Sequence, residues 1–418
     1  MNIERLYTAF TDSTGIATDS RKIEEGAMFF ALHGASFDGN DYAVQALRDG
    51  ASVAVIDRID ILEANAEYSE RLILVEDTLK ALQALAQEHR RELAIPIIAI
   101  AGSNGKTTTK ELVSRVLAEK FEVTTTKGNL NNHIGVPLTL LSMTQNTEFG
   151  VVEMGASAQG EIALLCSIAE PNYGILTNIG LSHLEGFGGV EGIRKGKGEL
   201  FDHLNEYGGH AFVPQEDGTL CDMVVEREDL ATEYYTRTIA EGFESNLTGD
   251  YNRYNIAAAV AVGRYFGIDD RHIGDAILSF TPDNNRSQAV KTERNSLVVD
   301  CYNANPSSME VALDNIATME AERKVLILGD MLELGEWSAE AHQNILRKAD
   351  TVAHEAILVG KEFATAYGVV KGELEGDYRL YPTTTEALND LKHKPLDGAL
   401  ILLKGSRGIA LEKLIEKL

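Results

Sequence analysis

A short glycine-containing segment with one lysine and several hydroxyl side chains directly follows an apolar run. The run covers residues 97–101, and the segment reads Gly102-Ser103-Asn104-Gly105-Lys106-Thr107-Thr108-Thr109. Glycines let backbone N–H groups approach phosphate oxygens, a lysine reaches the β and γ phosphates, and a hydroxyl at a helix N-terminus can bind Mg²⁺. The segment is shorter than the pattern G-x-x-x-x-G-K-[ST], but its order predicts a nucleotide phosphate site.

Two further polar side chains come at or after apolar runs. Glu153 closes the run that contains Val151 and Val152, and His183 lies a few residues beyond the run at 173–176. A carboxylate among apolar neighbours is awkward near a core, yet a solvated strand end would also explain it. His183 could bind Mg²⁺, and a hydrogen-bonded structural histidine is the ordinary alternative.

An asparagine pair opens a helical pattern at 256–265. Asn252 and Asn255 are three residues apart, so their amides can lie on one face of a helix and meet the edge of a nucleotide base. Helix capping by asparagine is the competing interpretation. The pair is therefore a candidate binding feature rather than an assignment.

The elements that must position these groups alternate between short apolar runs and helical patterns. Apolar runs lie at 28–32, 53–56, 72–75, 97–101, 151–152, 173–176, 297–299, 325–328, 356–359 and 400–403. Helical patterns lie at 42–48, 78–90, 307–319, 339–349 and 409–418. This order predicts an α/β protein with mostly parallel, doubly wound sheets that collect ligands at the carboxyl ends of their strands.

The apolar runs and helical patterns fall into three blocks, which we expect to be three domains. Residues 1–93 predict a small α/β domain, residues 94–289 a central P-loop-like domain with a mostly parallel sheet, and residues 290–418 a Rossmann-like doubly wound domain. At 418 residues, each domain is large enough to bury its own core.

Composition excludes several classes of protein. Apolar residues make up 44% and charged residues 24%, which is typical of a globular chain. The net charge of -26 opposes nucleic-acid binding, because cations must displace counterions from a phosphate backbone. No export signal or membrane span is expected, and Cys166, Cys221 and Cys301 have no metal-type spacing. We therefore expect a cytoplasmic protein, with the cysteines as small buried apolar residues.

Longer stretches around the predicted phosphate site resemble the Mur ligase family. In the central domain they are Gly102–Thr109, Lys127-Gly128-Asn129-Leu130-Asn131-Asn132-His133, Val152-Glu153-Met154-Gly155-Ala156-Ser157, Ser182-His183-Leu184-Glu185-Gly186-Phe187, Lys197-Gly198-Glu199-Leu200-Phe201 and Gly249-Asp250-Tyr251-Asn252. Thr18-Asp19-Ser20-Arg21 and Phe37-Asp38-Gly39 resemble its uridine-nucleotide domain. Tyr251 stands where the family usually has histidine. The resemblance covers nearly the whole chain.

Three C-terminal stretches are similar to one branch of this family. They are Asp300-Cys301-Tyr302-Asn303-Ala304-Asn305-Pro306, Leu328-Gly329-Asp330-Met331-Leu332-Glu333-Leu334-Gly335 and Lys404-Gly405-Ser406-Arg407. The resemblance implies a ligase that uses ATP to add D-Ala-D-Ala to UDP-N-acetylmuramoyl-tripeptide, through an acyl phosphate, during peptidoglycan precursor synthesis. A sibling ligase that adds an amino acid, a small-molecule kinase and a nucleotide-binding switch remain the alternatives.

The resemblance also implies roles for individual residues. ATP is expected to contact Gly102, Ser103, Asn104, Gly105, Lys106, Thr107, Thr108, Asn252, Asn255, Arg286 and Asp300. Two Mg²⁺ ions are expected at Thr107, Glu153, His183 and Lys197, with a carbamate on Lys197. The catalytic set is Lys106, Glu153, His183 and Lys197. Substrate contacts are expected from Ser20, Arg21, Asn129, Asn132, Ser157, Asn303, Asn305, Lys404, Ser406 and Arg407. We expect a monomer with no nucleic-acid partner and no membrane insertion.

Overall fold

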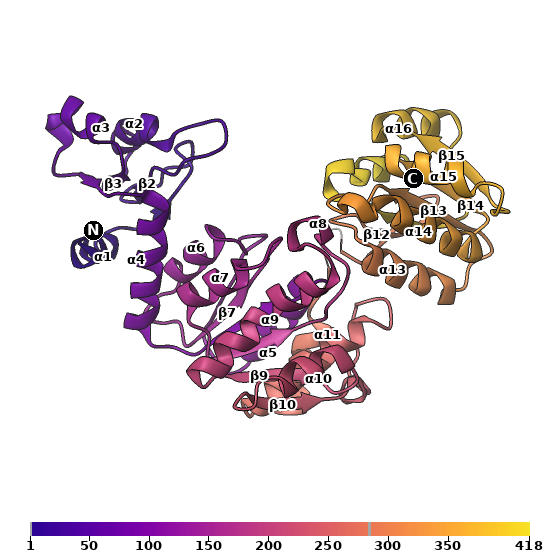
Figure 1. Ribbon diagram of the computed structural model, residues 1–418, viewed down its shortest axis with the longest axis horizontal. Helices are drawn as coiled ribbons and strands as arrows, with labels where there is room; N and C mark the ends of the chain where they lie inside the picture. The colour runs from indigo at the N-terminus through magenta and orange to yellow at the C-terminus, as the bar shows by residue number, and fades with distance from the viewer. Residues whose placement is uncertain (1, 283–285) are drawn as a thin grey trace.

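The computed structural model describes residues 2–282 and 286–418, which form three lobes, each built on its own sheet. Figure 1 shows the N-terminal and C-terminal lobes on opposite sides of the central one, to which both are joined. This arrangement confirms the predicted α/β class with three domains. The residue numbers at which we divided the chain stay a prediction.

The N-terminal domain has a four-stranded parallel sheet in the order β1-β2-β3-β4. Its strands are β1 Ile16–Ala17, β2 Met28–Phe30, β3 Val53–Ile56 and β4 Leu72–Leu74. Its helices are α1 Ile3–Thr11, α2 Ala43–Arg48 and α3 Ile59–Ala64, with the 3₁₀ turns η1 Gly39–Tyr42 and η2 Ala66–Tyr68. The sheet is short because the apolar runs that form it are only a few residues long.

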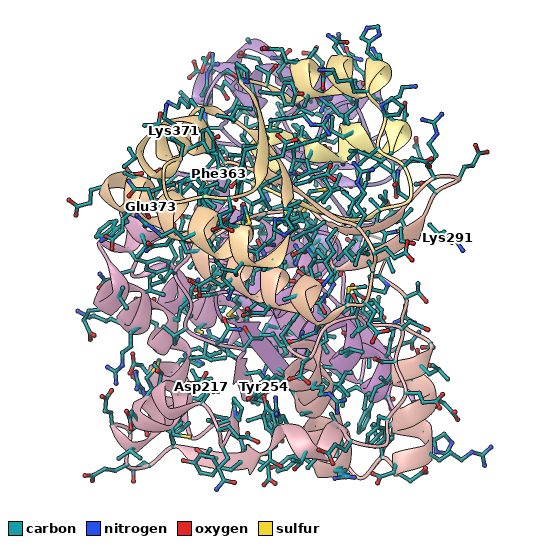
Figure 2. All side chains as sticks on the ribbon, turned by 90° about the vertical axis from the view of Figure 1, so that its right-hand side faces the viewer. Asp217, Tyr254, Lys291, Phe363, Lys371 and Glu373 are labelled. Carbon is teal, nitrogen blue, oxygen red and sulfur yellow. The ribbon has the colours of Figure 1, made fainter. Side chains whose placement is uncertain are left out.

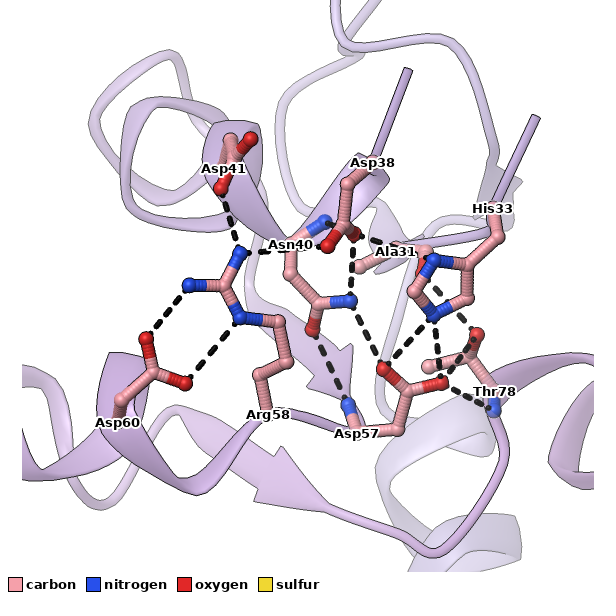
Figure 3. Close-up of polar contacts among 9 residues, drawn as sticks. All are labelled: Ala31, His33, Asp38, Asn40, Asp41, Asp57, Arg58, Asp60 and Thr78. Carbon is pink, nitrogen blue, oxygen red and sulfur yellow. Dashed lines mark hydrogen bonds and ion pairs between the residues drawn. The ribbon is translucent and has the colours of Figure 1, made fainter. Parts of the chain in front are cut away.

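A polar network ties the segment after β2 to the helix that leaves this domain (Figure 3). The Asp57 carboxylate accepts hydrogen bonds from Asn40 Nδ2 at 2.8 Å and from the Thr78 backbone N–H at 3.1 Å. Burial acts to raise the pKa of Asp57, but these hydrogen bonds hold that pKa below its usual value. Asp38 belongs to the same network through Asn40. The segment around Asp38 is therefore held against the start of α4.

Helix α4, Thr78–Leu93, runs from the N-terminal sheet onto the central domain (Figure 1). Its Arg90 donates to Ala169 O at 3.0 Å, and His89 Nε2 lies 2.9 Å from Met143 O. Burial lowers the pKa of His89, which favours the neutral ring at this contact. These buried hydrogen bonds fix the direction in which the N-terminal domain leaves the central one.

The central sheet is parallel throughout its described pairs, in the order β10-β9-β8-β5-β7-β6. Its strands are β5 Ile97–Ala101, β6 Val123–Thr125, β7 Phe149–Glu153, β8 Tyr173–Leu176, β9 His210–Pro214 and β10 Ala231–Tyr235. Its helices are α5 Lys106–Ala118, α6 Gly135–Leu141, α7 Glu161–Ala169, α8 Leu184–Phe187, α9 Val190–Tyr207, α10 Gly218–Val225, α11 Asn252–Tyr265 and α12 Asp270–Leu278, with η3 Arg237–Ala240.

Strand β5 lies at the centre of this sheet and is buried on both faces. Ile97, Ala99 and Ala101 pack with α7 and α9, whereas Ile98 and Ile100 pack with α5 and α11. The chain moves to β6 and β7 on one side of β5 and then to β8 on the other. A switch of direction of this kind opens a crevice at the carboxyl ends of the strands, where parallel α/β sheets bind ligands.

The C-terminal sheet has the order β11-β12-β16-β13-β14-β15 and is parallel except for β11, which pairs antiparallel with β12. Its strands are β11 Gln288–Lys291, β12 Ser296–Asp300, β13 Lys324–Gly329, β14 Glu355–Val359, β15 Asp377–Tyr381 and β16 Leu400–Lys404. Its helices are α13 Pro306–Thr318, α14 Ser338–Val352, α15 Lys361–Val370 and α16 Thr384–His393, with η4 Gly335–Trp337.

One predicted helix is wrong in type. The pattern at 409–418 predicts an α-helix, but the structure has two 3₁₀ segments, η5 Arg407–Ile409 and η6 Leu411–Lys417. Ala410 between them has a left-handed φ of 58°, which interrupts the helical hydrogen bonds. Leu411, Leu414 and Leu418 are nevertheless buried as the apolar pattern requires.

Candidate active site

The segment of residues 102–108, here called the phosphate loop, joins β5 to the N-terminus of α5. Gly102 and Gly105 have φ values of 128° and 80°, which residues with a side chain rarely adopt. A Cβ at Gly102 would lie 2.1 Å from Thr177 Oγ1, and a Cβ at Gly105 would lie 2.7 Å from Asn255 Oδ1. Both glycines are therefore required by conformation and by close contact, as the predicted phosphate site implies.

Lys106 folds back over this loop. Its Nζ donates to the carbonyl oxygens of Gly102 at 2.8 Å and Ser103 at 2.9 Å. Burial lowers the pKa of Lys106 to about 8, a shift that Glu153 opposes and Arg286 increases. A phosphate group would offer this ammonium stronger acceptors than two neutral carbonyls.

Glu153 ends β7 with its carboxylate almost fully buried beside the start of α5. Thr107 Oγ1 donates to one carboxylate oxygen at 2.8 Å, and Asn131 Nδ2 donates to the other at 2.8 Å. Gly155 leaves room for this amide, since a Cβ there would lie 2.9 Å from Asn131 Cγ. The hydroxyl and the carboxylate that we expected at one metal ion are thus in direct contact.

A cavity of about 1100 Å³ lies between the central and C-terminal domains, at the carboxyl ends of strands from both sheets. It is lined by predicted site residues from the two domains: Ser103, Asn104, Gly105, Lys106, Thr108, Asn129, Asn132, Glu153, Ser157, His183, Asn252, Asn255, Arg286, Asp300, Asn303, Asn305 and Lys404. Figure 2 faces the C-terminal domain and labels Asp217 and Tyr254, which line the cavity from the central domain. The structure therefore brings most of the predicted set together.

The asparagine pair on α11 is hydrogen-bonded to α5 directly after the phosphate loop. Asn255 Oδ1 accepts from Thr109 Oγ1 at 3.0 Å, and Asn255 Nδ2 donates to Asn252 Oδ1 at 2.8 Å. Asn252 Nδ2 donates to Thr248 O at 2.6 Å. Both amides line the cavity, but their polar atoms bond to Thr109, to Thr248 and to each other, a role that we did not predict.

Arg286 lies just before β11, near the junction of the central and C-terminal domains, and its side chain lines the cavity. Its guanidinium lies 3.8 Å from the centre of the Tyr302 ring and donates to Thr107 Oγ1. Arg407 lies 5.4 Å from the same ring. Tyr302 is thus the platform that orients Arg286 toward the phosphate loop, through stacking and cation–π attraction.

Asp300 and Lys404 form a partly enclosed ion pair on adjacent strands. The register of β12 and β16 places the two residues opposite each other, and Lys404 Nζ lies 2.5 Å from Asp300 Oδ2. The Ser287 N–H donates to the other oxygen of Asp300 at 3.1 Å. Each group is therefore already engaged by a partner of this chain.

His183 lines another part of the cavity, whereas Lys197 does not belong to the lining. Burial lowers the pKa of His183, although the nearby Glu333 acts to raise it. Lys197 is buried in α9, where its Nζ donates to Ala156 O at 2.9 Å. Burial and then the charge of Lys106 hold the pKa of Lys197 well below its usual value. This environment disfavours the charged ammonium.

Some predicted residues lie elsewhere. Ser20 and Arg21 belong to the N-terminal domain, where the exposed Arg21 pairs with Asp19 at 2.8 Å. That contact lowers the pKa of Asp19 to about 2. Ser406 does not line the cavity but accepts from the Leu332 N–H at 2.9 Å, so its hydroxyl supports a loop.

Sequence reasoning missed several residues at the site. Asn131, which holds Glu153, stands between Asn129 and Asn132, the two that we chose. Asn178 accepts from the Asn104 N–H at 3.1 Å and donates to Asn104 O at 3.0 Å. Each belongs to, or lies shortly before, a stretch that carried the family resemblance, which was the available signal.

Three family models match the chain: the Mur ligase family catalytic domain over residues 12–90, the Mur ligase middle domain over 100–233 and the Mur ligase glutamate ligase domain over 285–407. The chain belongs to the Mur ligase family. A Bacillus subtilis protein named UDP-N-acetylmuramoyl-tripeptide–D-alanyl-D-alanine ligase is 36% identical, and the alignment covers 97% of this chain and 93% of that protein. A Treponema pallidum protein of the same name is 34% identical, with 96% and 92% covered.

Solved structures agree with this assignment. A MurF structure from Acinetobacter baumannii matches with a TM-score of 0.84 at 28% identity, covering 100% of this chain and 98% of that one. A Thermotoga maritima MurF ligase in complex with ADP matches with a TM-score of 0.82 at 27% identity, covering 98% and 97%. Among the described residues, no helix is long and apolar enough to cross a membrane.

Proposed function

We propose that this chain is an ATP-dependent ligase that joins D-Ala-D-Ala to UDP-N-acetylmuramoyl-tripeptide, giving the UDP-linked pentapeptide, ADP and phosphate. The observation that carries the proposal is a cavity in which the phosphate loop of the central domain faces Asn303, Asn305 and Lys404 of the C-terminal domain. The names of the relatives that match over almost the whole chain support the choice of substrates. We also propose that the chain acts as a monomer in the cytoplasm.

The reaction joins a carboxylate to an amine and needs a leaving group better than hydroxide. In the proposed sequence, the terminal carboxylate of the tripeptide attacks the γ phosphorus of ATP, the bond to the β-phosphate oxygen breaks, and ADP leaves. The amine of D-Ala-D-Ala then adds to the acyl phosphate, loses one proton, and inorganic phosphate departs as the amide forms. Both steps move negative charge between oxygens, so positioning and cationic stabilisation supply most of the catalysis.

The residues of this chain can be assigned to those needs. The N–H groups of the phosphate loop would hold the phosphates at the N-terminus of α5. Lys106 would exchange the carbonyls of Gly102 and Ser103 for phosphate oxygens. Arg286, carried on Tyr302, would neutralise charge from the side of the C-terminal domain.

The donor set beside the phosphate loop fits Mg²⁺. Within the described residues, no three His, Cys, Asp or Glu side chains gather into a complete metal site. One carboxylate and one hydroxyl in contact, Glu153 and Thr107, match the way Mg²⁺ is held by few protein ligands together with substrate phosphates. Bound there, Mg²⁺ would neutralise the charge that develops on the phosphate oxygens.

A second Mg²⁺ would be held by His183 and Lys197. An ammonium cannot bind a cation, but a neutral lysine amine reacts with CO₂ to give a carbamate, which offers two oxygens. The lowered pKa of the buried Lys197 supports this modification. The unmodified amine, bound to Ala156 O as in this structure, is the alternative.

The peptide substrates would occupy the remaining lining. We assign Asn129, Asn132 and Ser157 to the tripeptide and Asn303, Asn305 and Lys404 to the dipeptide side. Ser20 and Arg21 would meet the uridine diphosphate on the N-terminal domain. Arg407 would act beside Tyr302, whereas the hydroxyl of Ser406 supports a loop and would act indirectly.

Mass spectrometry of the products tests the function directly. The intact protein, incubated with UDP-tripeptide, ATP, Mg²⁺ and D-Ala-D-Ala, should yield the pentapeptide together with ADP and free phosphate. Lys106→Ala should yield none while keeping its melting temperature, because this side chain contacts loop carbonyls rather than the core. Product formation with D-Glu, L-Ala or a diamino acid in place of D-Ala-D-Ala would reassign the chain to a sibling ligase. A stable phosphorylated product would indicate a kinase.

A further inference from the structure

A loop of the C-terminal domain reaches across to the central domain and is hydrogen-bonded to the rest of its own domain. This loop, residues 330–335, follows β13 and is here called the 330–335 loop. The Met331 N–H donates to Nε2 of the fully buried His342 at 3.0 Å, and the Leu332 N–H donates to Ser406 Oγ at 2.9 Å. The Ser406 N–H in turn donates to Asp330 O at 3.1 Å. These bonds hold the backbone just before Glu333, whose side chain is 61% exposed.

Glu333 meets His183 of the central domain. His183 Nδ1 lies 2.5 Å from Glu333 Oε2. The two groups are at ion-pair distance without the alignment of a directed hydrogen bond, so Nδ1 remains unsatisfied. The Glu185 N–H also approaches Glu333 O at 3.5 Å, which shows that the loop docks on the start of α8. Glu333 thus lies beside Nδ1 without completing a hydrogen bond to it, while His183 lines the cavity.

Both partners occupy strained backbone. His183 has a φ of 52° and Glu333 a φ of 62°, in the left-handed region that residues with a side chain seldom adopt. Neither position is glycine, so the side chain is kept despite the strain. Strained residues of this kind cluster where side chains must be aimed. Two of them face each other across a domain boundary.

We infer that Glu333 is a positioning residue for His183: the C-terminal domain supplies the carboxylate that orients the imidazole, so that Nε2 points to the cavity only when this domain is docked. The inference rests on the proposed function in taking His183 as a Mg²⁺ ligand. Histidines that bind metals usually donate their second N–H to a carboxylate, which fixes the tautomer and the ring orientation. Here that carboxylate comes from the domain assigned to the dipeptide, so docking of one half of the site completes the other.

Nuclear magnetic resonance of the imidazole nitrogens tests the inference in the metal-free, substrate-free protein, where turnover plays no part. His183 should show protonated Nδ1 and unprotonated Nε2, with its signals identified by their loss in His183→Gln. Glu333→Ala should shift these signals toward the mixed tautomers of a free imidazole. Glu333→Gln, which keeps an acceptor oxygen, should restore them in part. Glu336→Gln, an exposed neighbour beyond the loop, is the matched control and should change nothing.

The Mg²⁺ dependence of turnover gives the second measurement. The half-saturating Mg²⁺ concentration should rise about 10- to 100-fold in Glu333→Ala, with kcat largely recovered at high Mg²⁺. Unchanged His183 signals in Glu333→Ala would overturn the inference, and so would a loss of kcat that excess Mg²⁺ does not recover. The wild-type protein could make no pentapeptide while its His183 signals still respond to Glu333→Ala. That result would reject the proposed function but would support Glu333 as the residue that positions His183.

Discussion

Asn305 of the C-terminal domain donates a hydrogen bond of 2.9 Å from its Nδ2 to Oδ1 of Asn104 in the phosphate loop. The same Asn305 caps α13, because its Oδ1 accepts from the Ser308 N–H at 2.9 Å. One side chain therefore starts a helix with its oxygen and reaches the nucleotide site of another domain with its nitrogen. A second contact runs beside it, from the Leu181 N–H to Ser307 Oγ at 2.9 Å.

The Asn104–Asn305 contact should appear as an energetic coupling in catalysis. Asn305→Ser keeps a capping oxygen but is too short to reach Asn104, so its melting temperature should stay near that of the parent protein. Asn104→Ala and Asn305→Ser should each lower kcat/KM for ATP, and the double variant should lose less than the product of the two. We expect a coupling free energy of about 1 kcal/mol, which is about fivefold. Strictly multiplicative losses would show that the contact does not persist in the reacting protein.

Asn131 should matter for stability as well as for turnover. Its amide satisfies one oxygen of the buried Glu153, so Asn131→Ala leaves a buried carboxylate oxygen without a donor. The free energy of unfolding, measured in urea, should fall by about 1–3 kcal/mol. Asn129→Ala, at an exposed position two residues away, should stay within about 0.5 kcal/mol of the parent.

A second substitution separates the loss of this hydrogen bond from simple loss of packing. Glu153→Gln in the Asn131→Ala background removes the charge that needs the donor, so it should regain part of the lost stability. If both variants are equally unstable, Asn131 acts through packing against Gly155 rather than through Glu153.

Local patterns explain how much of the fold could be predicted from the sequence. The apolar run and the glycines of the phosphate loop are contained in one short window, and the predicted run at 97–101 has the bounds of β5. The C-terminal 3₁₀ segments were predicted as an α-helix, because the pattern of buried leucines shows which residues face the core but not the left-handed φ of Ala410.

Partner choice could not be predicted in the same way. Asn131 and Asn132 are neighbours of identical type, yet one holds Glu153 and the other accepts the Gly135 N–H at 2.9 Å at the start of α6. Their roles are decided by the direction of a loop in three dimensions. Asp300 and Lys404 are 104 residues apart in the chain, and only the register of β12 against β16 makes them partners.

The Asp300–Lys404 pair yields the last prediction. Lys404 is almost fully buried, and the side chain of Asp300 is 19% exposed. Lys404→Met would remove the cation while filling a similar volume, and it should lower the free energy of unfolding by about 1–3 kcal/mol, because a largely buried carboxylate loses its charged donor. Lys361→Met, whose lysine is 88% exposed in the same domain, should change stability by less than about 0.5 kcal/mol.

The compensating variant decides whether charge is the cause. Asp300→Asn in the Lys404→Met background still accepts the Ser287 N–H but needs no cation, so urea unfolding should show a partial recovery. Turnover should not recover with it, since both side chains line the cavity and are assigned to substrates. A double variant no more stable than Lys404→Met alone would mean that the methionine disturbs the packing between β12 and β16 and that the ion pair adds little.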